Sequence, residues 1–286
     1  MKLTFKAPAK INLFLELKNK RKDGYHNLET IMQTVDLYDE LTFESTDKGI
    51  FLECNDKALP TNTSNLVYKA AKAFLDYFEI DKGIKIYLKK VIPMGAGLGG
   101  GSSDAAATIA ALKKLYNVDT NKKELVRIAS KLGADVPFFL TCGTALCEGI
   151  GNIITPLKNI NNLNIVLVNP TFGVNTINVY KKVKFPLTNE VKITKIKTQI
   201  DGGSFDTNEA FSSCFNRLED FVLPNYPEIA KIKDVLNSFG CISLMSGSGA
   251  TVFGLFDFRV NLEALKIVLS KYNWKFWFVN STELSF

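Results

Sequence analysis

The chain of 286 residues is about twice the length of a typical domain of roughly 150 residues, so two domains are expected. Its 46% hydrophobic and 22% charged residues are typical of a globular protein. Its net charge of +6 comes from scattered lysines without a basic run, which does not favour a nucleic-acid partner. A surface that attracts anionic metabolites ranks above that interpretation, and a plain solvated lysine-rich exterior ranks highest. Five cysteines without a Cys-x-x-Cys pair, together with a single histidine, argue against a zinc site and indicate a reducing cytoplasm.

The N-terminal segment is predicted to form a strand, because inward and outward side chains alternate over residues 11–17. Lys10 and Asn12 then project from the face opposite the apolar one. The segment lacks the apolar core and cleavage site of a signal peptide, and no apolar run reaches the roughly 18–20 residues that span a bilayer. We therefore expect a cytoplasmic location and no membrane partner, and the sequence leaves open whether the protein is a monomer or a homodimer.

The next segments predict more strands and a helix. Asp23 and Gly24 mark a turn over residues 21–26. Strands are expected near residues 30–37, 40–45 and 50–54. An apolar stripe predicts a helix over residues 64–79, and alternation predicts a half-buried strand over residues 84–88.

A glycine-rich segment at residues 93–107 is the most informative part of the chain. Five glycines stand within residues 95–101, and Ser102 and Ser103 follow as predicted caps of a helix over residues 102–116. A glycine-rich turn at a helix N-terminus offers unpaired N–H groups and the positive end of the helix dipole. The segment therefore predicts a nucleotide phosphate bound at residues 95–104.

The remainder of the chain mixes helices and strands irregularly. A helix over residues 121–133 and a short strand over 144–148 precede a shift to Gly, Asn, Pro and Thr around residues 150–162, where we place the boundary between domains 1–157 and 158–286. Later strands are expected over residues 163–168, 251–256 and 275–279, helices near 207–219, 227–239 and 261–272, and an irregular polar connection over 185–206. This pattern favours an α+β fold over a doubly wound sheet.

Three kinds of phosphate-binding loop contain glycines in such a pattern. A Walker A loop needs a lysine after its glycines, and none follows here. A dinucleotide fingerprint is formally present as Gly95, Gly97 and Gly100, but the preceding strand carries three lysines instead of a continuous apolar run. The third kind is the glycine-serine loop of small-molecule kinases. The alternative without a ligand is a tight turn followed by a serine cap, and such a turn explains one or two glycines but not five.

The segment Pro93-Met-Gly-Ala-Gly-Leu-Gly-Gly-Gly-Ser-Ser-Asp resembles the signature of the galactokinase, homoserine kinase, mevalonate kinase and phosphomevalonate kinase superfamily. Residues 6–13 and 245–254 are similar to its first and third motifs. Within the superfamily, residues 10–12, 21–30 and 133–139 resemble the family of kinases that act on 4-diphosphocytidyl-2-C-methyl-D-erythritol. The resemblance implies a two-domain α+β kinase with its active site in the cleft between an N-terminal ATP-binding domain and a C-terminal substrate-binding domain.

The resemblance also implies roles for individual residues. Asp135 corresponds to the catalytic base, and Lys10 pairs with it. The residues implied for the substrate are Asn12, which orients it, Tyr25 and Tyr180, which stack on the cytosine, His26, which hydrogen-bonds the base edge, Thr176 beside Tyr180, and Gly247 and Gly249, which face the substrate phosphates. Each position has a plainer alternative: a surface lysine, a turn aspartate, an exposed histidine or an ordinary glycine turn.

The nucleotide site follows from the same resemblance. Ser102 or Ser103 is implied as a contact to Mg²⁺, although a capping role fits both. The residues implied for ATP are Asn65, Leu66, Pro93, Gly95, Gly97, Leu98, Gly99, Gly100, Gly101, Ser102 and Ser103.

The expected reaction is transfer of the γ-phosphoryl group of MgATP to the C2 hydroxyl of the cytidine diphosphate-linked methylerythritol, a step of the methylerythritol phosphate route to isoprenoids. Two alternatives remain open at this point. One is another small-alcohol kinase of the superfamily, and the other is a nucleotide-binding module without catalysis.

Overall fold

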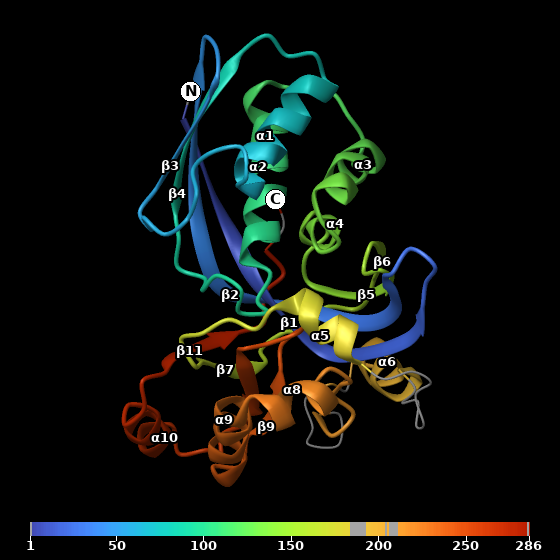
Figure 1. Ribbon diagram of the computed structural model, residues 1–286, viewed down its shortest axis with the longest axis vertical. Helices are drawn as coiled ribbons and strands as arrows, with labels where there is room; N and C mark the ends of the chain where they lie inside the picture. The colour runs from blue at the N-terminus through green and yellow to red at the C-terminus, as the bar shows by residue number, and fades with distance from the viewer. Residues whose placement is uncertain (1, 184–192, 204, 206–210, 285) are drawn as a thin grey trace.

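The structure is a computed structural model that describes residues 2–183, 193–203, 205, 211–284 and 286. Its elements form two sheets with helices packed against each (Figure 1). None of the described helices is both long and apolar enough to cross a membrane. The α+β class predicted from the sequence is confirmed.

The first sheet has seven strands and is built around two long ones, β1 (Lys2–Lys20) and β2 (His26–Thr46). Its path is β3-β4-β2-β1-β8, and β5 also pairs with β2 while β6 pairs with β5. The β3–β4 and β1–β8 pairs are parallel, and the other pairs are antiparallel. The shorter strands are β3 (Ile50–Cys54), β4 (Gly83–Lys89), β5 (Thr144–Gly149), β6 (Ile153–Pro156) and β8 (Phe215–Asn216).

The predicted strands near residues 30–37 and 40–45 are one continuous bent strand, β2. Its register against β1 shifts where Pro8 pairs with Tyr38 but Ala9 pairs with Val35, which leaves two residues of β2 without an opposite residue. A bulge of this kind bends a strand without ending it, and Pro8 has no N–H for the ladder. A second shift lies between Asn12 and Phe14.

Four helices cover one face of the first sheet: α1 (Leu66–Tyr77), α2 (Gly100–Leu115), α3 (Lys122–Leu132) and α4 (Val136–Phe139) (Figure 1). Asn65 and Asn121 cap α1 and α3 by accepting bonds from Val67 N and Glu124 N. Phe74 of α1 and Phe138 of α4 are fully buried in the core between these helices and the sheet. The alanine-rich α2 is buried over residues 103–109, whereas Gly101 in its first turn is exposed and Ser102 is half-buried.

The second sheet has the antiparallel order β11-β7-β10-β9, formed by β7 (Asn164–Asn169), β9 (Ile242–Met245), β10 (Val252–Phe256) and β11 (Lys275–Asn280). It packs onto β1 through a shared core in which Ile11 and Leu13 join Leu167 and Phe253. The helices of this half are α5 (Thr176–Lys182), α6 (Thr194–Asp201), α8 (Glu219–Asn225), α9 (Pro227–Ser238) and α10 (Leu262–Leu269).

Two expectations for this half are wrong. The connection over residues 185–206 is not irregular throughout, because α6 forms at residues 194–201; residues 184–192, 204 and 206 lie outside the described part. The helix expected near 207–219 is replaced at residues 215–216 by β8, while residues 206–210 are not described. Arg217 explains this strand, since its guanidinium makes two hydrogen bonds to the buried Glu16 of β1.

The proposed boundary between residues 157 and 158 stays a prediction. The chain leaves the first sheet after Pro156 and enters the second at Asn164. Two later segments return to the first sheet: β8 beside β1, and Ser281, which bridges to Val35 of β2.

Candidate functional site

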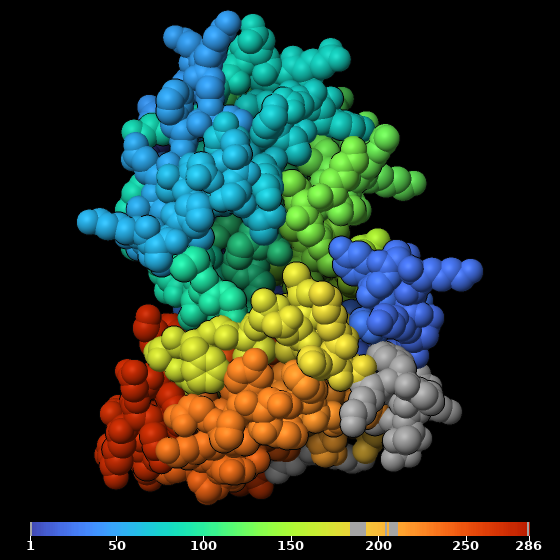
Figure 2. Space-filling view, in the orientation of Figure 1, coloured from blue at the N-terminus to red at the C-terminus, as the bar shows by residue number. Residues whose placement is uncertain are grey.

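A cleft of about 1040 Å³ lies between the glycine-rich segment, the middle of β1, α5 and the loop between β9 and β10. Figure 2 shows a recess above α5, drawn in yellow, where the two halves of the molecule meet. Most residues predicted for the site line this cleft. Those that do are Lys10, Asn12, Tyr25, His26, Asn65, Leu66, Pro93, Gly95, Gly97, Gly99, Gly100, Gly101, Ser102, Asp135, Thr176, Tyr180 and Gly247.

The glycine-rich segment turns sharply before α2 begins. Gly95, Gly97 and Gly99 have φ angles of 61°, 77° and 71°, a backbone region that favours glycine. The helix starts at Gly100 with Gly99 as its N-cap, so the prediction that serines cap it is wrong. The N–H groups at the start of α2 lack intrahelical acceptors and lie at the cleft, which is the arrangement that binds phosphate.

The loop between β9 and β10 is hydrogen-bonded to the glycine-rich segment. The hydroxyl of Ser246 donates to the carbonyl of Gly97 at 2.9 Å, and Thr251 N donates to Ala96 O at 3.2 Å. A Cβ on Gly97 would clash with the backbone carbonyl of Ser246. The two glycine-rich loops therefore pack backbone to backbone across the floor of the cleft.

Three predicted site residues do not line the cleft. Leu98 and Ser103 point into the protein interior, with 1% and 0% of their surfaces exposed. Leu98 still contributes its carbonyl, which accepts a bond from Lys10 N at 3.0 Å. A Cβ on Gly249 would meet Met245 Sδ at 2.8 Å, so this glycine serves the fold of its loop.

Lys10 and Asp135 are brought together from segments far apart in the chain. The Lys10 ammonium lies 3.9 Å from Asp135 Oδ2 and donates to Asn12 Oδ1 at 2.6 Å. Lys10 lies between the first and second of the three register shifts of β1 against β2. Asp135 directly precedes α4, whose four residues are all buried. A firmly anchored carboxylate and ammonium therefore face each other at the cleft.

Burial dominates the electrostatics of Lys10. Desolvation lowers the pKa of its ammonium, and the nearby carboxylate of Asp135 opposes that effect. The side chain of Asp135 is 31% exposed, whereas that of Lys10 is 4% exposed. The Asp135 carboxylate is therefore accessible to a ligand in the cleft, whereas the Lys10 ammonium is almost fully buried.

Asn12 is fixed by a short chain of hydrogen bonds. Its Nδ2 donates to Thr30 Oγ1 at 2.8 Å, and Thr30 Oγ1 donates to the carbonyl of Phe14 at 2.6 Å. Phe14 follows the second register shift of β1, so this bulge aims the polar side chains into the cleft. Thr30 was not predicted; it faces Asn12 only because β2 pairs with β1.

The far end of the cleft is aromatic. The rings of His26 and Tyr180 lie 5.7 Å apart with an angle of 31°, while Tyr25 beside them is 62% exposed. Burial, followed by the charge of Lys20, lowers the pKa of His26 below its usual value, so its imidazole is neutral at pH 7. Thr176 shares a 2.7 Å hydrogen bond with Ser248, which ties α5 to the loop after β9.

Asn65 and Leu66 border the cleft at the start of α1. The amide oxygen of Asn65 accepts from Val67 N at 2.8 Å, and its Nδ2 donates to Pro60 O at 2.6 Å. Its side chain is thus occupied as a helix cap. Leu66 lies beside Gly101, where a Cβ would be 3.6 Å from Leu66 Cδ1.

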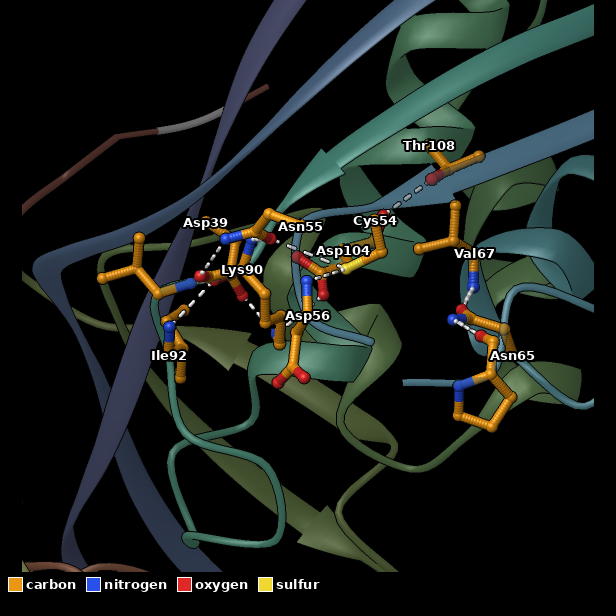
Figure 3. A network of polar contacts seen from close by, with 12 residues as sticks. Asp39, Cys54, Asn55, Asp56, Asn65, Val67, Lys90, Ile92, Asp104 and Thr108 are labelled. Atoms are coloured by element: carbon orange, nitrogen blue, oxygen red, sulfur yellow. Dashed lines mark hydrogen bonds and ion pairs between the residues drawn. The ribbon is translucent and has the colours of Figure 1, made fainter. Parts of the chain in front are cut away.

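Lys90 and Asp104 also line the cleft and were not predicted for the site. Figure 3 shows Lys90 bonded to Asp39 and lying beside Asp104. Two sequence features could have indicated them: Asp104 is the one charged residue in the first turns of α2, and Lys90 directly precedes the apolar pair Val91-Ile92.

Comparison with known proteins agrees with this geometry. Residues 65–143 match the N-terminal domain of GHMP kinases, and residues 203–272 match their C-terminal domain. The 4-diphosphocytidyl-2-C-methyl-D-erythritol kinase of Clostridium beijerinckii is 46% identical over 257 residues, which cover 89% of this chain and 91% of that protein.

Solved structures give the same picture. A crystal structure of 4-(cytidine 5'-diphospho)-2C-methyl-D-erythritol kinase superposes with a TM-score of 0.82 at 32% identity, covering 98% of this chain and 99% of that one. A homoserine kinase from Cytophaga hutchinsonii, at 19% identity and a TM-score of 0.76 over 99% and 95% of the two chains, shares the fold. The chain therefore belongs to the 4-diphosphocytidyl-2-C-methyl-D-erythritol kinase family of the GHMP kinases.

Proposed function

We propose that this protein transfers the γ-phosphoryl group of ATP to the C2 hydroxyl of 4-diphosphocytidyl-2-C-methyl-D-erythritol. The observation that carries the proposal is the buried Lys10 ammonium 3.9 Å from the Asp135 carboxylate, in a cleft that continues to the start of α2 on one side and to the His26–Tyr180 rings on the other. One pocket thus offers a phosphate cradle, a proton acceptor and an aromatic subsite.

In the proposed reaction, Asp135 accepts the proton of the substrate hydroxyl as its oxygen bonds to the γ-phosphorus. The bond between the γ-phosphorus and the β–γ bridging oxygen breaks, and ADP leaves with that electron pair. Lys10 holds the Asp135 carboxylate and faces the developing negative charge. Phosphoryl transfer depends mainly on alignment and charge neutralisation, which these fixed groups provide.

A magnesium ion fits this site as a companion of the triphosphate. Among the described residues, no group of three or more His, Cys, Asp or Glu side chains could hold a metal by itself. Mg²⁺ commonly keeps several waters and is bound largely through substrate phosphates. Ser102 lines the cleft, whereas the Ser103 hydroxyl is buried away from it, so Ser102 is the serine that would contact the ion. When bound, the ion neutralises charge on the phosphates.

The aromatic end of the cleft is proposed as the cytosine subsite. Tyr25 and Tyr180 stack on the two faces of the base, and neutral His26 hydrogen-bonds its edge. Remote binding of this kind positions a reacting hydroxyl without taking part in the chemistry. Thr176 and Gly247 also line the cleft, and a Cβ on Gly247 would lie 3.3 Å from the Lys10 ammonium. We place the diphosphate beside these two residues.

Replacing the second aromatic should weaken substrate binding selectively. Tyr180→Ala is expected to raise the KM for the cytidyl substrate about 5- to 100-fold, because a base–aromatic stack contributes about 1–3 kcal/mol. Tyr180→Phe keeps the ring and should stay close to wild type. Initial-rate kinetics with each substrate varied in turn provide the measurement. An equal rise in the KM for ATP would contradict the assignment of Tyr180 to the cytosine.

The function itself is tested by incubating the purified protein with ATP, Mg²⁺ and the cytidyl substrate and following phosphorus NMR. A new phosphomonoester signal that appears together with ADP is expected. Mevalonate and homoserine, offered in parallel, should give no product. A phosphomonoester from either of these alcohols but not from the cytidyl substrate would overturn the proposal in favour of another small-alcohol kinase.

A further inference from the structure

Three buried ionisable side chains meet behind the glycine-rich segment. The Lys90 ammonium donates to Asp104 Oδ2 at 2.9 Å and makes a short bond to Asp39 Oδ2. The side chains of Asp39, Lys90 and Asp104 are 0%, 6% and 2% exposed. They come from β2, from the residue after β4 and from α2, so the network ties three elements together (Figure 3).

The same network holds both ends of the glycine-rich segment. Asp39 Oδ1 accepts hydrogen bonds from Val91 N at 2.6 Å and Ile92 N at 2.8 Å, directly before Pro93. Asp104 follows Ser103 within α2. The chain just before the segment is therefore bonded to Asp39, and the helix that follows its glycines carries Asp104. Lys90 bridges the side chains of these two aspartates.

Lys90 is itself held from several directions. The Asn55 side chain accepts from Lys90 N at 2.6 Å and donates to Lys90 O at 3.2 Å (Figure 3). A Cβ on Gly100 would lie 2.8 Å from the Lys90 ammonium, so the first residue of α2 rests against it. Burial alone would lower the pKa of Lys90, but Asp104 and Asp39 outweigh it, and its pKa is raised. The ammonium therefore stays charged, and its hydrogen bonds hold it in one place against Gly100.

We propose that Asp39 is a positioning residue for the nucleotide, acting through Lys90 and Asp104 to hold the glycine-rich segment in its phosphate-binding shape. Asp39 is not among the residues that line the cleft, whereas Lys90 and Asp104 are. Its effect on ATP must therefore pass through the segment. The inference rests on the proposed ATP-dependent reaction but not on the identity of the alcohol.

The decisive variant is Asp39→Asn, because both oxygens of Asp39 accept hydrogen bonds and the amide NH₂ would face either the Lys90 ammonium or the N–H groups of Val91 and Ile92. We expect the Kd for a non-hydrolysable ATP analogue, measured by calorimetry without the alcohol, to rise about 10- to 100-fold, because the loss of one hydrogen bond to a charged group has about this effect on an equilibrium. The KM for the alcohol should change less than about twofold. Asp76→Asn, which removes an exposed carboxylate paired with Lys72 on α1, is the matched control and should match wild type.

Asp104→Asn provides an internal comparison. Its amide oxygen can accept from Lys90, and its NH₂ takes the place of Asp104 Oδ1, which is buried without a hydrogen-bond partner among the described residues. Analogue binding by this variant should weaken less than binding by Asp39→Asn, since the bridge from Lys90 to α2 is kept and the bonds from Val91 N and Ile92 N to Asp39 are untouched.

Clear results would overturn the proposal. Asp39→Asn protein that is folded and binds the analogue within twofold of wild type would do so, as would equal losses for the analogue and the alcohol. If Asp39→Asn alone does not fold, Asp39→Ser is the second variant, because its single hydroxyl cannot reach both Lys90 and the N–H groups of Val91 and Ile92. The same selective loss of analogue binding is required of it. Because the analogue is bound without the alcohol, failure here is separable from an error in the proposed substrate.

Discussion

Asp135→Asn is expected to lower kcat about 10²- to 10⁴-fold while the affinity for ATP changes little, since a positioned general base contributes that range of rate. The amide preserves the size of the side chain but cannot accept the hydroxyl proton. It also removes the negative charge that opposes the lowering of the Lys10 pKa by burial, so the ammonium is less firmly charged in the variant. Both changes act on the chemical step.

The measurement is single-turnover transfer with both substrates saturating, together with calorimetric titration of an ATP analogue. Asp81→Asn, at an exposed position before β4, is a suitable control and should retain wild-type rates. A kcat for Asp135→Asn within about threefold of wild type would remove this carboxylate from the mechanism.

Among substitutions that add one methyl group to the cleft, Gly97→Ala is expected to reduce stability and activity the most. At φ 77° the new side chain is strained, and its Cβ would clash with the Ser246 carbonyl. Left-handed strain and overpacking together should lower the free energy of unfolding by about 2–5 kcal/mol. Because the two glycine-rich loops must separate, kcat/KM for ATP should fall by about 10²-fold or more.

Chemical denaturation and steady-state kinetics measure the two effects. Gly101→Ala is the matched control for stability, because its Cβ meets Leu66 Cδ1 at an ordinary 3.6 Å and the residue is helical. That variant should be as stable as wild type or more stable by up to about 1 kcal/mol. Equal stabilities of the Gly97 and Gly101 variants would show that the packing between the two loops does not constrain Gly97.

Features that depend on neighbouring residues could be predicted from the sequence. The glycines at 95, 97 and 99 adopt positive φ angles, and Asn121 caps α3. In both cases the physical cause lies within a few residues of chain. The pairing of Lys10 with Asp135 was expected because the surrounding motifs resemble those of a kinase family; neither side chain indicates it alone.

Features that depend on distant partners could not be read in this way. β8 has two residues and exists because Arg217 reaches Glu16 on β1, about two hundred positions earlier in the chain. β2 continues through its bend because β1 supplies the opposite strand. Neither has a period that a sequence pattern could reveal.

By itself, the sequence determined where the backbone can bend around a phosphate and which strands and helices form in the first half of the chain up to α3, since sterics and hydrophobic alternation act locally. Only the tertiary structure decided that Asp39, Lys90 and Asp104 share one buried site beneath that phosphate loop and that Ser246 closes on Gly97. Packing brings these groups within hydrogen-bond distance, and the cost of leaving buried charge unpaired then fixes their arrangement.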